Sequence, residues 1–155
     1  MRNRFSKHTV GAAIALAAAL AWGTAAVSDQ GSNSAVTYYR AENVATSFAK
    51  GAVLHAEPGE NYMIHTSRRV APGMAEIHAK DTDLIYVLEG SATFVTGGRA
   101  IDGKATAPDE IRGKSIEGGE TRVLSKGDVI IVPNGVPHWF KEVQGPLLYY
   151  TIKVR

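Results

Sequence analysis

The hydrophobic and polar positions of the chain change their pattern near residue 61. From there to the C-terminus, short runs of alternating apolar and polar residues are separated by clusters of Gly, Pro, Asn and Asp. Alternation with a period of two is typical of half-buried β-strands, and the clusters are typical of turns. The pattern predicts strands at 62–69, 75–79, 84–90, 91–96, 121–124, 128–132, 138–143 and 147–154.

The residues before this region follow other patterns. Residues 27–40 are polar and predict a loose lead. Residues 41–51 carry Val44 and Phe48 four positions apart and end at Gly51, which predicts one short amphipathic helix with a glycine stop. Many short strands and almost no helix favour an all-β sandwich or barrel, jelly rolls included.

The strand pattern has one long interruption, at residues 97–119, which are Gly-rich and charged. We expect a long loop there, because no alternating run is visible. Loops of such length are usually functional or mobile. A solvated insertion without a role is the alternative.

The first residues predict an export signal, which is not part of the fold. A basic start precedes a short apolar run at 10–21, and small residues then lead to a cleavage point after Ala26. The apolar run is shorter than the roughly 20 residues that a membrane-spanning helix needs, so a cleaved signal peptide at 1–26 is favoured over an anchor. We expect a periplasmic or secreted protein with a lead and helix at 27–60 and a β-domain at 61–155.

Composition narrows the chemistry. The 155 residues include no cysteine, so disulfides and thiolate sites are excluded and any metal must be held by His, Asp or Glu. Loss of Arg2, Arg4 and Lys7 with the signal leaves 14 basic against 15 acidic residues. Without a basic stripe, nucleic acid is not an expected partner, and after signal cleavage neither is a membrane.

One histidine stands where the local sequence fixes its direction. In GDVIIVPNGVPHWF, residues 127–140, Pro133 ends one strand, Gly135 reverses the chain and His138 begins the next strand. This arrangement suits a residue that is aimed at a ligand. The alternative is a histidine that merely packs within a β protein.

The spacing of Gly127, Pro133, Gly135 and His138 resembles the second motif of the cupin family, Gly-x5-Pro-x-Gly-x2-His. The resemblance implies a single-domain, cupin-type jelly-roll β-barrel. It also implies a homodimer, since cupins commonly pair through edge strands.

An upstream stretch is similar to the first cupin motif, His-x-His-x3–4-Glu-x6-Gly. The run YVLEG and the x6 spacing from Asp83 to Gly90 carry this similarity, and the two resemblances together cover about residues 62–150. In this frame His78 takes the first ligand position and Lys80 the second, and Asp83 lies one residue closer to His78 than the pattern has it.

The resemblance implies a metal site made of His78, Asp83 and His138. A lysine ammonium has no lone pair for a metal, so two imidazoles and one carboxylate remain, which resembles the facial triad of non-haem Fe(II). Fe(II) or Mn(II) is the expected metal, and Ni(II) and Zn(II) are compatible. His65 is a candidate fourth ligand. Asp83 capping a turn is the alternative for that residue.

Two basic residues, Lys80 and Arg68, are candidates for catalytic contact with substrate. On a regular strand Lys80 shares the face of His78, and Arg68 or Arg69 has a guanidinium that binds carboxylates bidentately. Solvated surface charges are the alternative.

We therefore expect an exported, metal-binding cupin that acts on a small anionic organic molecule, with dioxygenase, isomerase or lyase chemistry. The alternative function is a non-catalytic small-ligand-binding or sensing cupin with a degenerate metal site. Lys80 in a ligand position favours this alternative.

Overall fold

The computed structural model describes residues 36–155, so the expected signal at 1–26 and most of the polar lead lie outside the described residues. The described elements are α1 (Ala41–Lys50), β1 (Val53–His55), β2 (Tyr62–Arg69), β3 (Ala75–His78), β4 (Thr82–Thr96), β5 (Arg99–Ile101), β6 (Lys104–Ala107), β7 (Glu110–Gly113), β8 (Ser115–Glu117), β9 (Glu120–Ser125), β10 (Val129–Val132) and β11 (His138–Val154). The all-β prediction with one short helix is confirmed.

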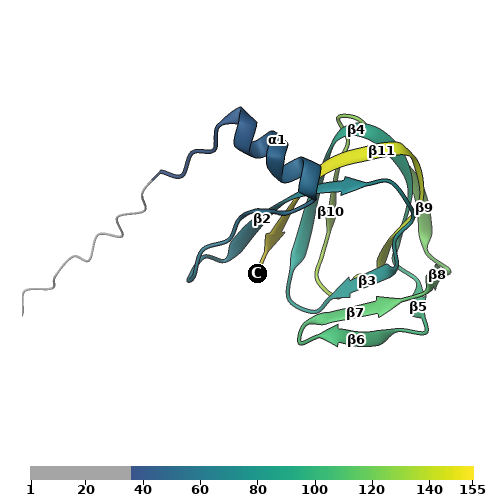
Figure 1. The fold of residues 1–155 in the computed structure, drawn as a ribbon. Helices are drawn as coiled ribbons and strands as arrows, with labels where there is room; N and C mark the ends of the chain where they lie inside the picture. The colour runs from purple at the N-terminus through teal and green to yellow at the C-terminus, as the bar shows by residue number, and fades with distance from the viewer. Residues whose placement is uncertain (1–35) are drawn as a thin grey trace, which may run out of the picture. The chain divides into compact units, whose positions relative to one another are not determined.

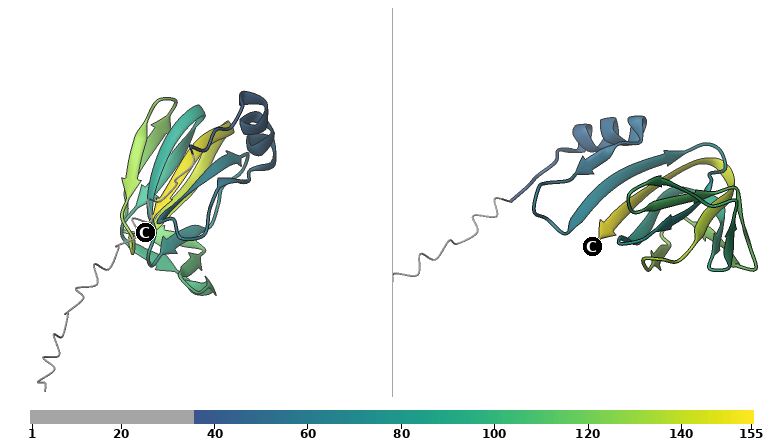
Figure 2. Two further views of the ribbon diagram at one scale, coloured as in Figure 1. Left: turned by 90° about the vertical axis from the view of Figure 1, so that its left-hand side faces the viewer. Right: turned by 90° about the horizontal axis from the view of Figure 1, so that it is seen from below.

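Two long strands, β4 and β11, organise the sheet (Figure 1). They pair antiparallel from His138 opposite Thr96 to Val154 opposite Thr82. β11 also pairs with β2 and, at its first residue, with β3, while β4 pairs with β9 and β10. β7 and β6 continue the sheet beyond β3, so that the strands curl round a common interior (Figures 1 and 2).

Two pairs of predicted strands are single strands in the structure. The sequence pattern separates strands 84–90 and 91–96, and strands 138–143 and 147–154, but in the structure each pair is continuous, as β4 and β11. Gly90 has φ 79°, and a Cβ there would collide with the carbonyl oxygen of Pro146. Glycine therefore lets β4 bend close against β11, while the pairing shifts by a bulge between Gln144 and Leu148.

The long loop expected at 97–119 is also corrected by the structure. This segment forms β5 to β8, in which β5 pairs with β8, β6 with β7, and β7 with β3. Each strand has only three or four residues, too few to display a period of two in the sequence. The segment is therefore ordered: β6 and β7 extend the main sheet, and β5 and β8 form a separate two-stranded sheet.

The predicted helix is confirmed as α1, which Gly51 ends in the left-handed conformation at φ 61°. Phe48 is buried, and its ring lies 5.0 Å from that of Tyr150 on β11. Tyr150 alternates with Tyr149, which faces the interior, so α1 covers the outer face of the sheet (Figure 2). No helix among the described residues is long and apolar enough to cross a membrane.

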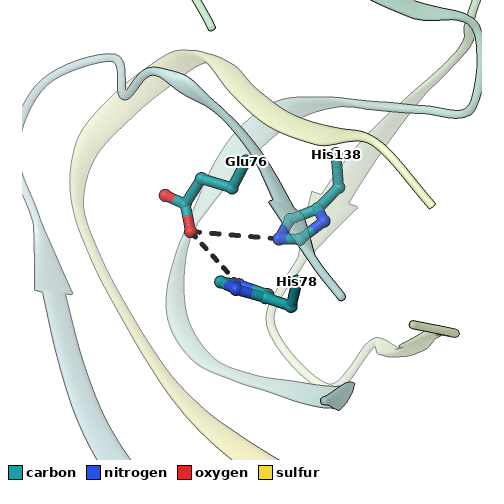
Figure 3. A group of neighbouring side chains, drawn as sticks. All are labelled: Glu76, His78 and His138. Carbon is teal, nitrogen blue, oxygen red and sulfur yellow. Dashed lines mark ion pairs between the residues drawn. The ribbon is translucent and has the colours of Figure 1, made fainter. Parts of the chain in front are cut away.

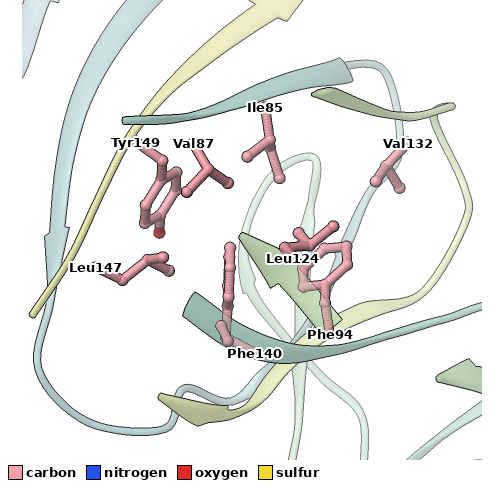
Figure 4. Close-up of a cluster of buried hydrophobic side chains, with 9 residues drawn as sticks. Ile85, Val87, Phe94, Leu124, Val132, Phe140, Leu147 and Tyr149 are labelled. Atoms are coloured by element: carbon pink, nitrogen blue, oxygen red, sulfur yellow. The ribbon is translucent and has the colours of Figure 1, made fainter. Parts of the chain in front are cut away.

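A cluster of buried side chains fills part of the interior (Figure 4): Ile85, Val87, Ala92, Phe94, Leu124, Val132, Phe140, Leu147 and Tyr149. The ring centroids of Phe94 and Phe140 are 4.6 Å apart, and the ring centroid of His138 is 6.1 Å from that of Phe94. Burial of one such side chain contributes about 1.5–3 kcal/mol. The apolar core therefore also supports a histidine of the cavity described next.

Candidate metal centre

A polar cavity of about 260 Å³ lies inside the curled sheet. Three histidines, three carboxylates and three basic side chains line it: His65, His78 and His138; Glu76, Asp83 and Glu110; Arg69, Arg112 and Lys153. With neutral imidazoles, the acidic and basic charges of the cavity balance. This concentration of partly buried ionisable groups is typical of a functional site.

His78 and His138 meet here from separate parts of the chain. His78 is the last residue of β3, and His138 is the first residue of β11, where it lies opposite Glu76. Both histidines are buried, and their ring centroids are 5.1 Å apart. The turn before β11 and the end of β3 therefore direct two imidazoles to one point.

Glu76 completes a cluster with these histidines (Figure 3), in which one ligand atom from each residue lies within 4.8 Å of the others. Its Oε2 is 3.6 Å from Nε2 of His78 and 3.9 Å from Nε2 of His138. Its Oε1 is 2.5 Å from Nη1 of Arg112. One oxygen of the carboxylate is thus held by a cation, and the other faces both imidazoles.

Asp83 has the same arrangement. Its Oδ2 lies 3.4 Å from Nε2 of His78 and 3.7 Å from Nε2 of His138. Its Oδ1 accepts a hydrogen bond of 2.7 Å from Nζ of Lys153. A second carboxylate therefore presents a free oxygen to the same two nitrogens.

The hydrogen bonds of His138 fix which nitrogen faces the cluster. Its Nδ1 lies 3.1 Å from the carbonyl oxygen of Val136, which can only accept, so Nδ1 carries the proton and donates it. Burial lowers the pKa of His138, which keeps the ring neutral. Nε2 then carries a lone pair toward Glu76 and Asp83.

His78 has a buried Nε2 with no hydrogen-bond partner. Burial alone would lower its pKa, but the negative charges of Asp83 and Glu76 outweigh this and raise the pKa to about 9. In the metal-free protein His78 therefore carries a proton at neutral pH.

Both carboxyl groups are ionised at neutral pH. Burial alone would raise their pKa values, but His78 and Arg112 hold the pKa of Glu76 below its ordinary value. His78 and Lys153 do the same for the pKa of Asp83. Metal ligands must be deprotonated, and these two groups already are.

The residues present therefore fit a divalent metal. Two imidazole nitrogens and two carboxylate oxygens face one point, and the buried Nε2 of His78 lacks any other partner. Nitrogen and oxygen donors of this kind suit Fe(II), Mn(II), Ni(II) and Zn(II).

Of the four residues expected from the sequence as ligands, the structure brings His78, Asp83 and His138 together. The cluster of ligand atoms consists of Glu76, His78 and His138; Asp83 lies beside it, within 3.7 Å of both imidazoles, while His65 lines the same cavity without such a contact to them. Its Nε2 is 3.1 Å from Sδ of Met63. Burial and the charge of Lys153 lower the pKa of His65, so it is neutral beside the site.

The two basic residues expected near the substrate lie elsewhere, which corrects their predicted positions. β3 ends at His78, so Lys80 is not on the strand; its side chain is 65% exposed and pairs with Asp109. Arg68 faces the opposite side of β2, where it lines an apolar hollow of about 550 Å³ beside α1 that has no ligating group. Arg69, the neighbour on the inner face, lines the polar cavity instead.

Glu76 is the site residue that the sequence interpretation missed. The spacing was the signal that could have revealed it. With Lys80 in the second ligand position, Asp83 lies one residue closer to His78 than the first cupin motif allows. Moving the motif by two residues gives Glu76-x-His78-x4-Asp83-x6-Gly90, which keeps every spacing of the first cupin motif, with Glu76 in place of its first His and Asp83 in place of its Glu. Arg112 and Glu110 were missed because they fall in the expected loop.

Comparison with known proteins agrees with this fold. The sequence profile of the Cupin family matches residues 61–152. No curated protein shows a significant match to the chain. Among solved structures, a protein from Bacillus halodurans aligns with a TM-score of 0.53 at 14% identity over 79% of this chain and 83% of that one.

Two further structures align less closely. A cupin 2 conserved barrel domain protein from Rhodopseudomonas palustris gives a TM-score of 0.46 at 15% identity over 66% of this chain, and the match spans only 57% of that protein. Hydroquinone 1,2-dioxygenase from Sphingomonas sp. TTNP3, solved with 4-hydroxybenzoate bound, gives a TM-score of 0.46 at 16% identity. The match covers 65% of this chain and 68% of that protein. The expected cupin-type jelly-roll fold is confirmed, and the chain belongs to the cupin family.

Proposed function

We propose that this cupin binds a divalent metal through His78, His138, Glu76 and Asp83 and acts on a small anionic organic molecule in the barrel cavity. The observation that carries the proposal is the convergence of two imidazole nitrogens and two carboxylate oxygens, at 3.4 to 3.9 Å, beside a buried Nε2 without a partner. Fe(II) and Mn(II) are the proposed metals.

A metal held there would supply a Lewis acid that polarises an oxygen of the substrate. The protein's own residues prepare the site for it. Arg112 and Lys153 each hold the outer oxygen of one ligand carboxylate, and Val136 fixes the tautomer of His138. Neutral His65, on the wall of the same cavity, is available to take up a proton.

The size and charge of the cavity support a small anion as substrate. The three acidic and three basic side chains of the cavity cancel, so a divalent ion that displaces the proton of His78 would leave the cavity positive. Dioxygenase, isomerase and lyase reactions all fit such a site, because the cupin fold hosts many chemistries.

The test is metal binding by untagged protein, measured by elemental analysis and by titration calorimetry with Mn(II) and Fe(II). We expect one equivalent of metal for the wild type and a loss of at least 100-fold in affinity for His78→Ala and for His138→Ala. His65→Gln is the matched control on the same wall; a large loss there would make His65 a ligand as well. Less than about 0.1 equivalent in reconstituted wild-type protein would refute the proposal.

A non-catalytic small-ligand-binding or sensing cupin is the second candidate, favoured by one observation. Each cavity carboxylate already has a basic partner: Glu76 and Glu110 pair with Arg112, and Asp83 pairs with Lys153. Such a site is stable without metal. Ligand binding that is equal in metal-free and metal-loaded protein would favour this candidate.

We also propose that the protein is exported and forms a homodimer. The basic start and apolar run before Ala26 support export, and the family resemblance supports pairing. A mature protein beginning at Val27 in the periplasm or medium, with the sedimentation mass of a dimer, is the expected result. A full-length cytoplasmic monomer would contradict both.

A further inference from the structure

We propose that Arg69 anchors the substrate through a carboxylate, and that the substrate is a small carboxylic acid with a second oxygen close to its carboxyl group. This proposal rests on the metal-dependent function proposed above, because the second oxygen is assigned to the metal side of the cavity. It adds a specificity-determining residue and a substrate class.

Among the described residues, Arg69 is the one arginine or lysine of the cavity whose donors are not taken up by a carboxylate at short range. Arg112 lies 2.5 Å from Glu76, and Lys153 lies 2.7 Å from Asp83. The carboxylate oxygen that pairs with Arg69 in the part of the chain that the structure describes is Oε1 of Glu76, 3.8 Å from Nη2, and the hydrogen bond of Arg69 to the Tyr149 hydroxyl is long, at 3.4 Å.

Packing holds this guanidinium in place. Its Cζ lies 4.8 Å from the centroid of the Phe140 ring, a cation–π contact. A Cβ at residue 73 would collide with Nη1 of Arg69, so Gly73 leaves the space that the guanidinium occupies. The side chain is 22% exposed, which leaves access from the cavity. A planar, preoriented guanidinium suits bidentate binding of a carboxylate.

The position of Arg69 limits the length of the ligand. Glu76 stands between the two parts of the site, with Oε1 3.8 Å from Nη2 of Arg69 and Oε2 3.6 Å from Nε2 of His78. A carboxylate on Arg69 therefore lies one side chain away from the ligand nitrogens. The cavity volume of about 260 Å³ lies at the small end of the range for ligand sites. A hydroxy or oxo acid of a few carbons meets both limits.

The test compares lactate with lactamide, which has nearly the same shape but no charge. Both are titrated into Co(II)-loaded protein, with the Co(II) absorption spectrum as readout, and into metal-free protein by calorimetry. We expect lactate to bind the wild type at least tenfold more tightly than lactamide. Arg69→Gln should remove at least tenfold of the lactate affinity, with lactamide affinity and Co(II) affinity changed less than threefold.

Arg68→Gln is the matched control, because it removes the same group from the outer face of the same strand. It should bind lactate as the wild type does, and Arg69→Lys should fall between wild type and Arg69→Gln. Equal lactate binding by the two Gln variants, or no preference for lactate over lactamide, would overturn the proposal. Failure to bind Co(II), with lactate binding to metal-free protein still dependent on Arg69, would refute the metal function and leave the anion site standing.

Discussion

The two oxygens of Glu76 have different partners, and this division explains how a glutamate can stand where the cupin motif has a histidine. Oε1 lies against Arg112, while Oε2 faces the two imidazoles. With Oε1 held by Arg112, Oε2 is available as an oxygen donor at the position where the motif has an imidazole nitrogen. The site is thereby more negative than the motif prescribes.

Glu76→Gln should lower Mn(II) affinity by about 100-fold, because it replaces a charged carboxylate ligand with a neutral amide. Loss of a residue that only orients a metal ligand already lowers affinity by about 10–100-fold. Lys80→Gln should leave affinity within twofold, since Lys80 is exposed. Titration calorimetry measures both. If Lys80→Gln lowered the metal affinity and Glu76→Gln did not, the motif alignment that puts Lys80 in the second ligand position would be supported instead.

Protonation of His78 should compete with metal. Its pKa in the metal-free protein is about 9, raised by Asp83 and Glu76 against the effect of burial, so one proton must leave before Nε2 binds. Apparent Mn(II) affinity should then rise about tenfold per pH unit between pH 7 and 8.5. The free energy of unfolding of the metal-free protein should instead fall as the pH rises.

The reason is that a raised pKa stabilises the folded state below the unfolded value of 6.5, and this contribution is lost as pH rises through about 9. Thermal unfolding of chelator-treated protein from pH 6 to 10 gives the second trend, and NMR titration of the His78 ring gives the pKa. A His78 pKa below 6.5 would contradict the charge arrangement described above.

At this scale the sequence could give His78, Asp83 and His138 because the motif spacings are local. It could not give Glu76 or Lys153, since a carboxylate or a lysine carries no directional signal until its strand is registered against its neighbours. Lys80 was misplaced because the end of β3 at His78 is decided by pairing with β7, which lies more than thirty positions along the chain.

Among the elements, β7 has the clearest role in the site. Its register with β3 sets Arg112 opposite Glu76 and Glu110 opposite His78, so each ligand on β3 faces an ionisable partner. Arg112 bridges the two carboxylates, at 2.5 Å to each. A segment that the sequence marks only as Gly-rich and charged thus supplies the residues that surround the proposed metal ligands.

Arg112→Gln should weaken Mn(II) binding by about 10–100-fold, the range for partners that orient metal ligands, because Glu76 loses the cation that fixes its outer oxygen. Arg99→Gln is the control within the same segment. It removes an ion pair with Glu117 whose side chains are 72% and 69% exposed, and it should leave metal affinity unchanged. Equal affinities for the two variants would mean that β7 does not orient the ligands.

Gly90→Ala should destabilise the protein more than Gly97→Ala. Both positions have positive φ, at 79° and 74°, so both substitutions incur backbone strain of about 1–3 kcal/mol. Only at residue 90 does the new Cβ meet backbone, at Pro146, which adds about 1–3 kcal/mol of overpacking. Urea unfolding of the two variants measures the difference, and equal losses would show that β4 and β11 separate at no cost.

The elements that the sequence predicted are those with enough length to show a period. The helix and the inner strands followed from spacing and from Gly51, Pro133 and Gly135. The joining of residues 82–96 into one strand did not, because a glycine that bends a strand and a glycine that turns the chain look alike. Four short strands at 99–117 were likewise hidden by their length.

At the scale of the whole molecule, the side chains that line the cavity come from β2, β3, β4, β7 and β11. A metal bound there contacts strands from across the sheet, so it should stabilise the entire domain. At a free Mn(II) concentration of 100 times Kd, binding adds about 2.7 kcal/mol to the free energy of unfolding. A domain of this size should then melt about 10 °C higher. Differential scanning calorimetry of chelator-treated and metal-loaded protein measures the shift, which should vanish in His78→Ala.

Anomalous diffraction from crystals of Mn(II)-loaded protein tests the central claim most directly, because it locates the metal itself. We predict one strong peak inside the cavity, within bonding distance of Nε2 of both His78 and His138 and of at least one oxygen of Glu76 or Asp83. A cavity without a peak, or Mn(II) found only at surface carboxylates, would contradict the proposal that these four residues form a metal centre.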